Sequence, residues 1–169
     1  VLDRFEDTAT LGVFAAISHL LLIGALAVNS LGAAVTPRLS RYFNEGRLGL
    51  YYREIAISCG AALFVSLGFI GVAYVAGDFI ITLIYGRSLG DQGDLVFAMA
   101  LASVPIYLGS IIGFVPPALQ AYRFHLTVNI ATLVGPFGAA LYFIPTHGVM
   151  GAVYAIIVQG VLQLLNAFI

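Results

Sequence analysis

The chain has 169 residues, of which 61% are hydrophobic and 9% are charged, and its formal net charge is −1. Its mean hydropathy of +1.03 lies well outside the range of soluble domains, so the composition excludes a soluble globular protein. The small net charge, with no basic block interleaved with aromatic residues, excludes nucleic-acid binding.

Five apolar stretches follow one another along the chain, and each is close to the roughly 20 residues that an α-helix needs to cross a bilayer. The seven basic and eight acidic residues all lie outside these stretches. The sequence therefore predicts an all-α, polytopic transmembrane helix bundle that forms a single membrane domain over residues 1–169. The predicted spans are 11–35, 55–77, 95–119, 126–144 and 149–169.

The charges sort by sign into alternate gaps between the predicted spans. Five of the seven arginines fall in gaps 36–54 and 120–125, whereas six of the eight acidic residues fall in segments 1–10 and 78–94. Because arginine-rich loops stay on the cytoplasmic side, this pattern predicts that the N-terminus is outside and the C-terminus is cytoplasmic. The chain starts at Val1 without a methionine and ends in an apolar stretch at Ile169, which indicates a fragment of a longer protein.

The sequence contains no recognisable catalytic constellation. It contains no lysine, which excludes a Walker A loop and a Schiff-base lysine within this segment. His19, His125 and His147 are far apart, and no Cys/His cluster indicates a metal site. We therefore expect no enzymatic activity, no metal and no cofactor, apart from a coupling ion that would be a proton or sodium.

Polar side chains inside the predicted spans recur at helical spacing, and most of the amides lie toward the cytoplasmic half. Polar groups at lipid depth usually face the bundle interior or a water-filled cavity, so we treat them as candidate cavity-lining residues. The alternative is that they only bridge neighbouring helices. His19, the only ionisable side chain deep in a span, is the candidate for proton coupling. The full set is His19, Asn29, Ser30, Ser103, Tyr107, Ser110, Asn129, Gln159, Gln163 and Asn166.

Three loop motifs carry a resemblance to a known family. The gap after the first span reads PRLSRYFNEG from Pro37 to Gly46, LIYG ends at Gly86, and the last outer gap reads PTHGVMGA from Pro145 to Ala152. In order and spacing they resemble the P-x-L-S-x-x-F-x-x-G, L-x-x-G and P-x-x-G-x-x-G-A patterns of Wzx-type polysaccharide flippases, which belong to the MATE/MOP flippase superfamily. The resemblance covers essentially the whole chain. It implies the last five spans of a protein of about twelve, or most of the C-terminal helical bundle.

The resemblance also implies a function. Such a protein would translocate a polyprenyl-diphosphate-linked saccharide, such as an O-antigen precursor for lipopolysaccharide, to the outer leaflet for cell-surface polysaccharide biosynthesis. It would work by alternating access in the plasma (inner) membrane of a bacterium or archaeon. Its partners would be the lipid-linked saccharide, membrane lipids and the N-terminal bundle of the same protein. Two alternatives stay open, a MATE-like exporter of amphipathic small molecules and a structural membrane subunit.

The matched motif residues are expected to have structural roles. The proline of the first motif would end the first helix, and the glycines would turn the chain or allow tight packing at the turn into the last helix. These residues are Pro37, Gly46, Gly86, Pro145, Gly148 and Gly151.

Two arginines of the first motif are candidates for a contact with substrate. Arg38 and Arg41 are three residues apart, so they would share a helical face at the membrane surface. Lipid phosphate is the natural partner for basic side chains at this depth. The two residues are therefore candidates for contact with lipid headgroups or with the substrate diphosphate.

Overall fold

Four long α-helices make up the part of the chain that the structure describes. The computed structural model describes residues 8–85, 93–115 and 122–165, and no strand occurs in these ranges. The helices are α1 (Thr8–Asn44), α2 (Leu48–Tyr85), α3 (Gly93–Gly113) and α5 (Tyr122–Leu165). All four are long and apolar enough to cross a membrane, which confirms the prediction of an all-α protein with several such helices.

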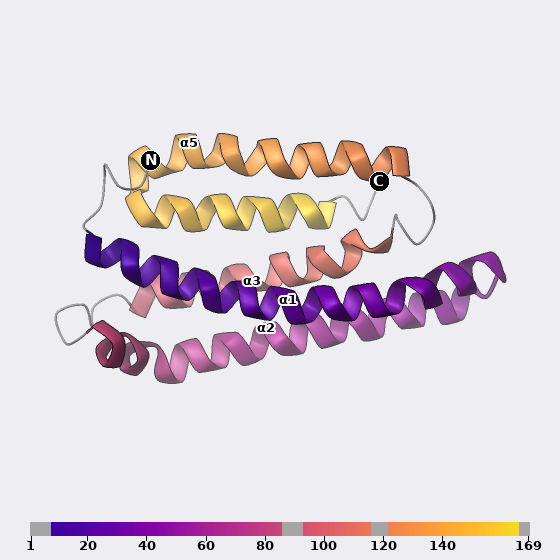
Figure 1. Ribbon diagram of the computed structural model, residues 1–169, viewed down its shortest axis with the longest axis horizontal. Coiled ribbons are helices and arrows are strands. Elements are labelled where there is room, and N and C mark those ends of the chain that lie inside the picture. The colour runs from indigo at the N-terminus through magenta and orange to yellow at the C-terminus, as the bar shows by residue number, and fades with distance from the viewer. Residues whose placement is uncertain (1–7, 86–92, 116–121, 166–169) are drawn as a thin grey trace.

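Helix α3 is the central element of the bundle. It packs against α1, α2 and α5, whereas α1 and α5 hardly touch each other. Helices α1 and α2 run antiparallel as a long hairpin, and α5 lies along the other side of α3 (Figure 1). The core follows α3, where Met99 and Ala102 are at most 1% exposed and pack with Ile17 of α1 and Val153 of α5.

Helix α5 reverses its direction at Gly148. This glycine has φ 57° and ψ −132°, which are not helical, and Figure 1 shows α5 running back alongside itself. The rings of Phe143 and Tyr154 lie 5.9 Å apart across the reversal. Gly151 lies against the backbone of Phe143, where a Cβ would have no room. We call residues 122–147 the first arm of α5 and residues 149–165 the second arm.

Because of this reversal, the number of helical elements in the described residues differs from the number of spans that the sequence predicted. The sequence predicted two separate spans, 126–144 and 149–169, with a non-helical gap between them. In the structure the first arm continues through the predicted gap, because helical backbone extends to His147 and resumes directly after Gly148. The structure thus contains four helical elements where five spans were predicted.

Helix α1 does not end at Pro37, as the sequence predicted, but continues to Asn44. A proline removes one backbone donor from a helix, which weakens the helix locally but need not end it. Here Val35 and Leu39, on either side of the proline, are buried with Tyr51 of α2 in one small cluster. This packing holds the helix together on both sides of the missing hydrogen bond.

The chain turns between α1 and α2 at Gly46 rather than at the proline. Gly46 has a φ of 69°, in the left-handed region that glycine adopts without a steric penalty. The Arg47 N–H donates to the Tyr42 carbonyl at 2.9 Å, which closes the turn. Most of the predicted gap 36–54 is therefore helical, and α2 also extends past its predicted span to Tyr85.

Candidate functional site

Two of the predicted cavity-lining residues are instead buried inside the bundle. Ser103 is 0% exposed and its hydroxyl donates to the Ala100 carbonyl at 2.6 Å. Tyr107 is 1% exposed and its hydroxyl donates to the Leu21 carbonyl of α1 at 2.8 Å. Tyr107 therefore joins α3 to α1, and the prediction that these two residues line an open cavity is wrong. In the apolar core both hydroxyls find backbone acceptors. Tyr107 thereby has the bridging role weighed as the alternative, whereas Ser103 bonds within its own helix α3.

Helix α1 has one buried face, which packs on α2 and α3. The buried apolar residues of α1 recur at helical spacing, and they are Ile17, Leu21, Val28, Val35 and Leu39. At about 100° per residue, His19 and Ser30 point roughly 150–180° away from the middle of this stripe, and Asn29 points about 100° away. These three polar side chains therefore lie on the other side of the helix.

We call this other side the outer face of α1. It mixes polar and apolar side chains along most of the helix, every member is exposed, and no described helix covers it. Its members are His19, Leu22, Ile23, Leu26, Asn29, Ser30, Ala33, Pro37 and Arg41, and the three large apolar ones, Leu22, Ile23 and Leu26, are 53%, 63% and 58% exposed.

The polar groups of the outer face differ in how they are satisfied. Ser30 donates its hydroxyl to the Leu26 carbonyl at 2.8 Å, so it is satisfied within its own helix. The side chains of His19 and Asn29 form no hydrogen bond with any described residue. An amide or imidazole without a partner is costly in hydrocarbon, where no water replaces the missing bond. The outer face therefore needs water or further protein beside it.

The two candidate arginines lie in different surroundings. Arg38 is paired with Glu54 of α2 at 3.2 Å, with side-chain exposures of 64% and 18% respectively. Arg41 is exposed, and its guanidinium carbon lies 5.2 Å from the centroid of the Tyr42 ring. Among the described residues Arg41 has no acidic partner, so its charge remains available to an anion. Arg38 turns instead toward α2.

The glutamines of the second arm of α5 also differ from each other. Gln159 lies in an open groove of ≈ 310 Å³ between the two arms of α5 and Phe14 of α1, and it is the only polar residue that lines this groove. Gln163 packs against Gly109 of α3. Its Oε1 is buried and has no hydrogen-bond partner among the described residues. Gln163 therefore belongs to a helix–helix contact and Gln159 to an open surface.

The remaining predicted residues add little to this surface. Ser110 is half-buried on α3. Asn166 and Gly86 lie outside the described residues, and only the backbone of Asn129 is described. Pro145 is exposed inside the first arm of α5, three residues before the reversal.

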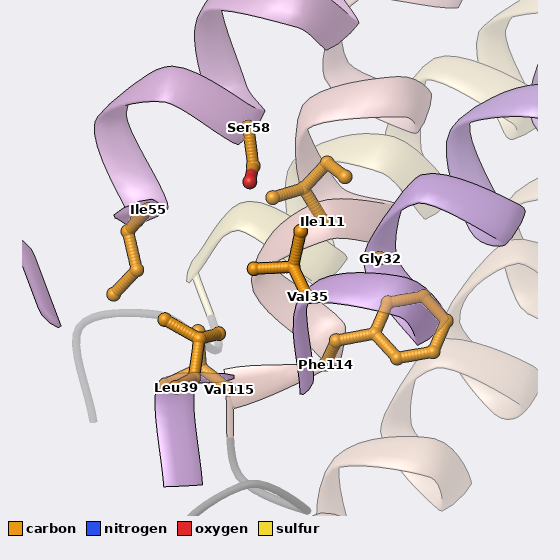
Figure 2. A pocket seen from close by; sticks show the side chains of 8 residues that line it. All are labelled: Gly32, Val35, Leu39, Ile55, Ser58, Ile111, Phe114 and Val115. Carbon is orange, nitrogen blue, oxygen red and sulfur yellow. The ribbon is translucent and has the colours of Figure 1, made fainter. Parts of the chain in front are cut away.

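A small pocket between α1, α2 and α3 has a volume of only ≈ 10 Å³. Figure 2 shows that its lining is almost entirely hydrocarbon, with Phe114 beside Gly32 and the Ser58 hydroxyl as the one polar side-chain group. That hydroxyl already donates to the Glu54 carbonyl at 2.9 Å. The pocket is too small for any substrate and offers a water molecule too few partners, so it is a packing gap.

Several glycines lie where two helices contact each other closely, and the sequence did not show which glycines these are. The ring of Tyr107 lies over Gly24, and the ring of Phe114 lies over Gly32. Gly160 of α5 faces the backbone of Pro105 in α3. The abundance of small residues signalled close packing in general. It did not show which glycines face another helix.

No group of three or more His, Cys, Asp or Glu residues that could hold a metal ion occurs within residues 8–85, 93–115 and 122–165. The described surface offers hydrogen-bonding groups and two exposed guanidinium groups, those of Arg41 and Arg53, that have no acidic partner among the described residues. The Thr146 hydroxyl lies 2.8 Å from the Nδ1 of His147.

Comparison with known proteins gives one informative similarity. The chain is 19% identical over 168 residues to the capsular polysaccharide biosynthesis protein CapF of Staphylococcus aureus. This similarity covers 99% of the chain but only 42% of the relative, so the chain spans less than half of that protein's length. No protein-family model matches the chain, and no solved structure matches it.

Proposed function

We propose that this chain is the C-terminal part of a membrane flippase that moves a polyprenyl-diphosphate-linked saccharide to the outer leaflet for cell-surface polysaccharide biosynthesis. The observation that carries the proposal is the outer face of α1, where the side chains of His19 and Asn29 have no hydrogen-bond partner among the described residues. The similarity to a capsular polysaccharide biosynthesis protein supports the polysaccharide link. The loop motifs of Wzx-type flippases support the translocation step.

The proposal includes a topology in the plasma membrane of the cell. Each arm of α5 would cross the bilayer once, so that α1, α2, α3 and the two arms make five crossings. The second arm has 17 described residues, which lies at the lower limit for a span. The arginine-rich turn at Gly46 would then be cytoplasmic, and the reversal at Gly148 would be outside.

In this arrangement the outer face of α1 would line the passage that the rest of the protein completes. Hydroxyl and amide groups can form hydrogen bonds with a saccharide. Such groups along α1, together with water, would replace part of the hydration shell that the saccharide loses on entering the passage. Arg41, at the cytoplasmic end of the same face, would meet the diphosphate as the substrate enters. His19, near the opposite end, would be the group that couples transport to protons.

Cysteine accessibility in the full-length protein tests this passage. In a Cys59→Ser background, Asn29→Cys and Ser30→Cys should react with a membrane-impermeant thiol reagent. The matched controls are Phe64→Cys and Leu67→Cys on α2, which are 79% and 62% exposed, have only apolar residues three and four positions away and should be shielded by lipid. Equal protection of all four positions would rule out a wet outer face.

A complementation assay tests the activity itself. The full-length protein should restore surface polysaccharide in a cell that lacks its own flippase, and Asn29→Leu should reduce the amount restored. Gln would be the conservative replacement at this position, and it should retain most of the activity. Resistance to amphipathic drugs without any restored polysaccharide would instead identify an exporter.

A further inference from the structure

The end of the α1–α2 hairpin has features beyond the proposed passage, which uses only Arg41 of this region. We call residues 38–54 the hairpin tip. It contains four arginines and two glutamates, so its formal charge is four minus two, or +2. Figure 1 shows that this end of the hairpin projects past the neighbouring end of α3.

The depth of the hairpin tip follows from the packing of α3. Helix α3 has 21 residues, which makes it about 32 Å long, close to the roughly 30 Å thickness of the hydrocarbon core. Val115, just after α3, packs against the buried cluster of Val35, Leu39 and Tyr51. One boundary of the hydrocarbon therefore lies near Leu39 on α1 and Tyr51 on α2.

The hairpin tip then fills the layer of lipid headgroups. From Leu39 to the turn at Gly46, helix α1 rises by about 10 Å. The polar layer on each side of a bilayer is about 5–7 Å thick, so the tip reaches through it and only slightly beyond. At this depth the groups nearest to the protein surface are lipid phosphates rather than soluble proteins.

The arginines of the tip are exposed, and not all of them are neutralised. Arg38 pairs with Glu54 and Arg47 pairs with Glu45, each at 3.2 Å. Arg41 and Arg53 are exposed and form no ion pair with any described acidic residue. They point to different sides of the hairpin, because Arg41 lies on the outer face of α1 and Arg53 lies opposite the buried Tyr51 face of α2. The tip therefore presents positive charge around its circumference.

Aromatic and aliphatic side chains accompany these charges. Tyr52 is 64% exposed and Phe43 is 44% exposed, and both rings contact Tyr51, with centroid distances of 5.3 Å and 5.8 Å. Leu48 is also 50% exposed. Tyrosines combined with basic residues are typical of segments held at the membrane–water interface. The buried Tyr51 keeps the tip rigid, so the exposed groups are presented in a fixed arrangement.

We propose that the hairpin tip is a docking surface for the phosphate headgroups of anionic phospholipids, held mainly by Arg41 and Arg53. The charge of the tip is complementary to an anionic leaflet, and its depth matches the headgroup layer. This inference does not depend on the flippase proposal, because it concerns bulk lipid rather than the transported molecule. An acidic cytoplasmic protein is the competing occupant, and it would need the tip to reach well beyond the lipid surface.

Lipid binding to the purified full-length protein tests the proposal. After delipidation in mild detergent, the protein is titrated with phosphatidylglycerol or with phosphatidylcholine, and bound lipids are counted by native mass spectrometry. Phosphatidylglycerol should bind more tightly. The double variant Arg41→Gln/Arg53→Gln should weaken its binding by about twenty-fivefold, because each surface arginine contributes about fivefold. Circular dichroism and gel filtration confirm that each variant is folded.

Three further measurements make the result decisive. Arg41→Lys/Arg53→Lys keeps the charge and should keep most of the binding, and Glu45→Gln should strengthen it. Inorganic phosphate in excess should compete poorly, because the acyl chains of the lipid would add contacts near Tyr52, beside the hydrocarbon boundary. Equal affinity for the two lipids, an unchanged affinity in the Gln double variant, or full competition by inorganic phosphate would each overturn the proposal. Binding of an acidic peptide that displaces phosphatidylglycerol would overturn it in favour of a protein partner.

Discussion

Replacement of Gly160 by alanine tests a close backbone contact between α3 and the second arm of α5. A Cβ at this position would lie 2.8 Å from the Ile106 nitrogen, 2.8 Å from the Pro105 carbonyl carbon and 2.9 Å from the Pro105 Cβ. Two of these atoms are backbone, so they cannot rotate away. The second arm must move away from α3 to admit the methyl group, and it loses contacts along its length.

The size of the effect is the difference between two opposing terms. Overpacking of a tight contact costs about 1–3 kcal/mol. A change from glycine to alanine inside a helix favours the folded state by about 1 kcal/mol. The matched control is Gly68→Ala on α2, where no atom lies within 4 Å of the added Cβ, so only the favourable term remains. The two variants should therefore differ by about 1–3 kcal/mol, with Gly160→Ala the less stable.

Thermal unfolding of the full-length protein in detergent, followed by circular dichroism, measures this difference. Gly160→Ala should lower the midpoint relative to the wild type, and Gly68→Ala should leave it unchanged or raise it. If both variants shift the midpoint by the same amount, α3 and the second arm of α5 are not in close contact at Gly160. The packing described for this pair of helices would then be wrong.

Two further variants probe the turn and the core by the same measurement. Gly46→Ala should lower the free energy of unfolding by about 1 kcal/mol, because alanine does not favour the left-handed backbone at this position. The control is Gly49→Ala, which lies in a helix with open space around it. An equal response of the two variants would contradict a requirement for glycine at the turn. Tyr107→Phe should cost about 0.6 kcal/mol by removing the hydroxyl that joins α3 to α1. Tyr142→Phe, at a side chain 70% exposed, should cost nothing, and a larger loss there than at Tyr107 would refute the bridging role.

Hydropathy was sufficient to predict most of the fold, but it failed where a local contact decides the outcome. Long apolar stretches separated by charged gaps predicted the helices that the structure contains. The end of α1 was misplaced because the rule that proline ends a helix ignores packing on either side of Pro37. The reversal of α5 was expected to need a non-helical gap, yet one glycine, Gly148, is enough to make it.

The candidate site shows a different limit of sequence reasoning. Helical spacing correctly grouped Ser103 with Tyr107, and His19 with Ser30, on shared faces. It could not show which way each face points, because in a membrane protein a polar face suits either the bundle interior or a wet passage. Only the positions of the neighbouring helices separate the two cases. Tyr107 is buried against α1, whereas His19 is exposed.

The two faces of α1 together give it the properties that the proposed flippase would need in one of its helices. One face is apolar and packs tightly on α2 and α3, so its position is fixed by the bundle. The outer face carries Asn29 and His19 where hydrocarbon would leave them unsatisfied, so lipid is an unfavourable neighbour at these two positions. A helix held firmly on one side and polar on the other is suited to form the wall of a passage. The hairpin tip at its end would fix that wall in the headgroup layer, where Arg41 belongs to both surfaces.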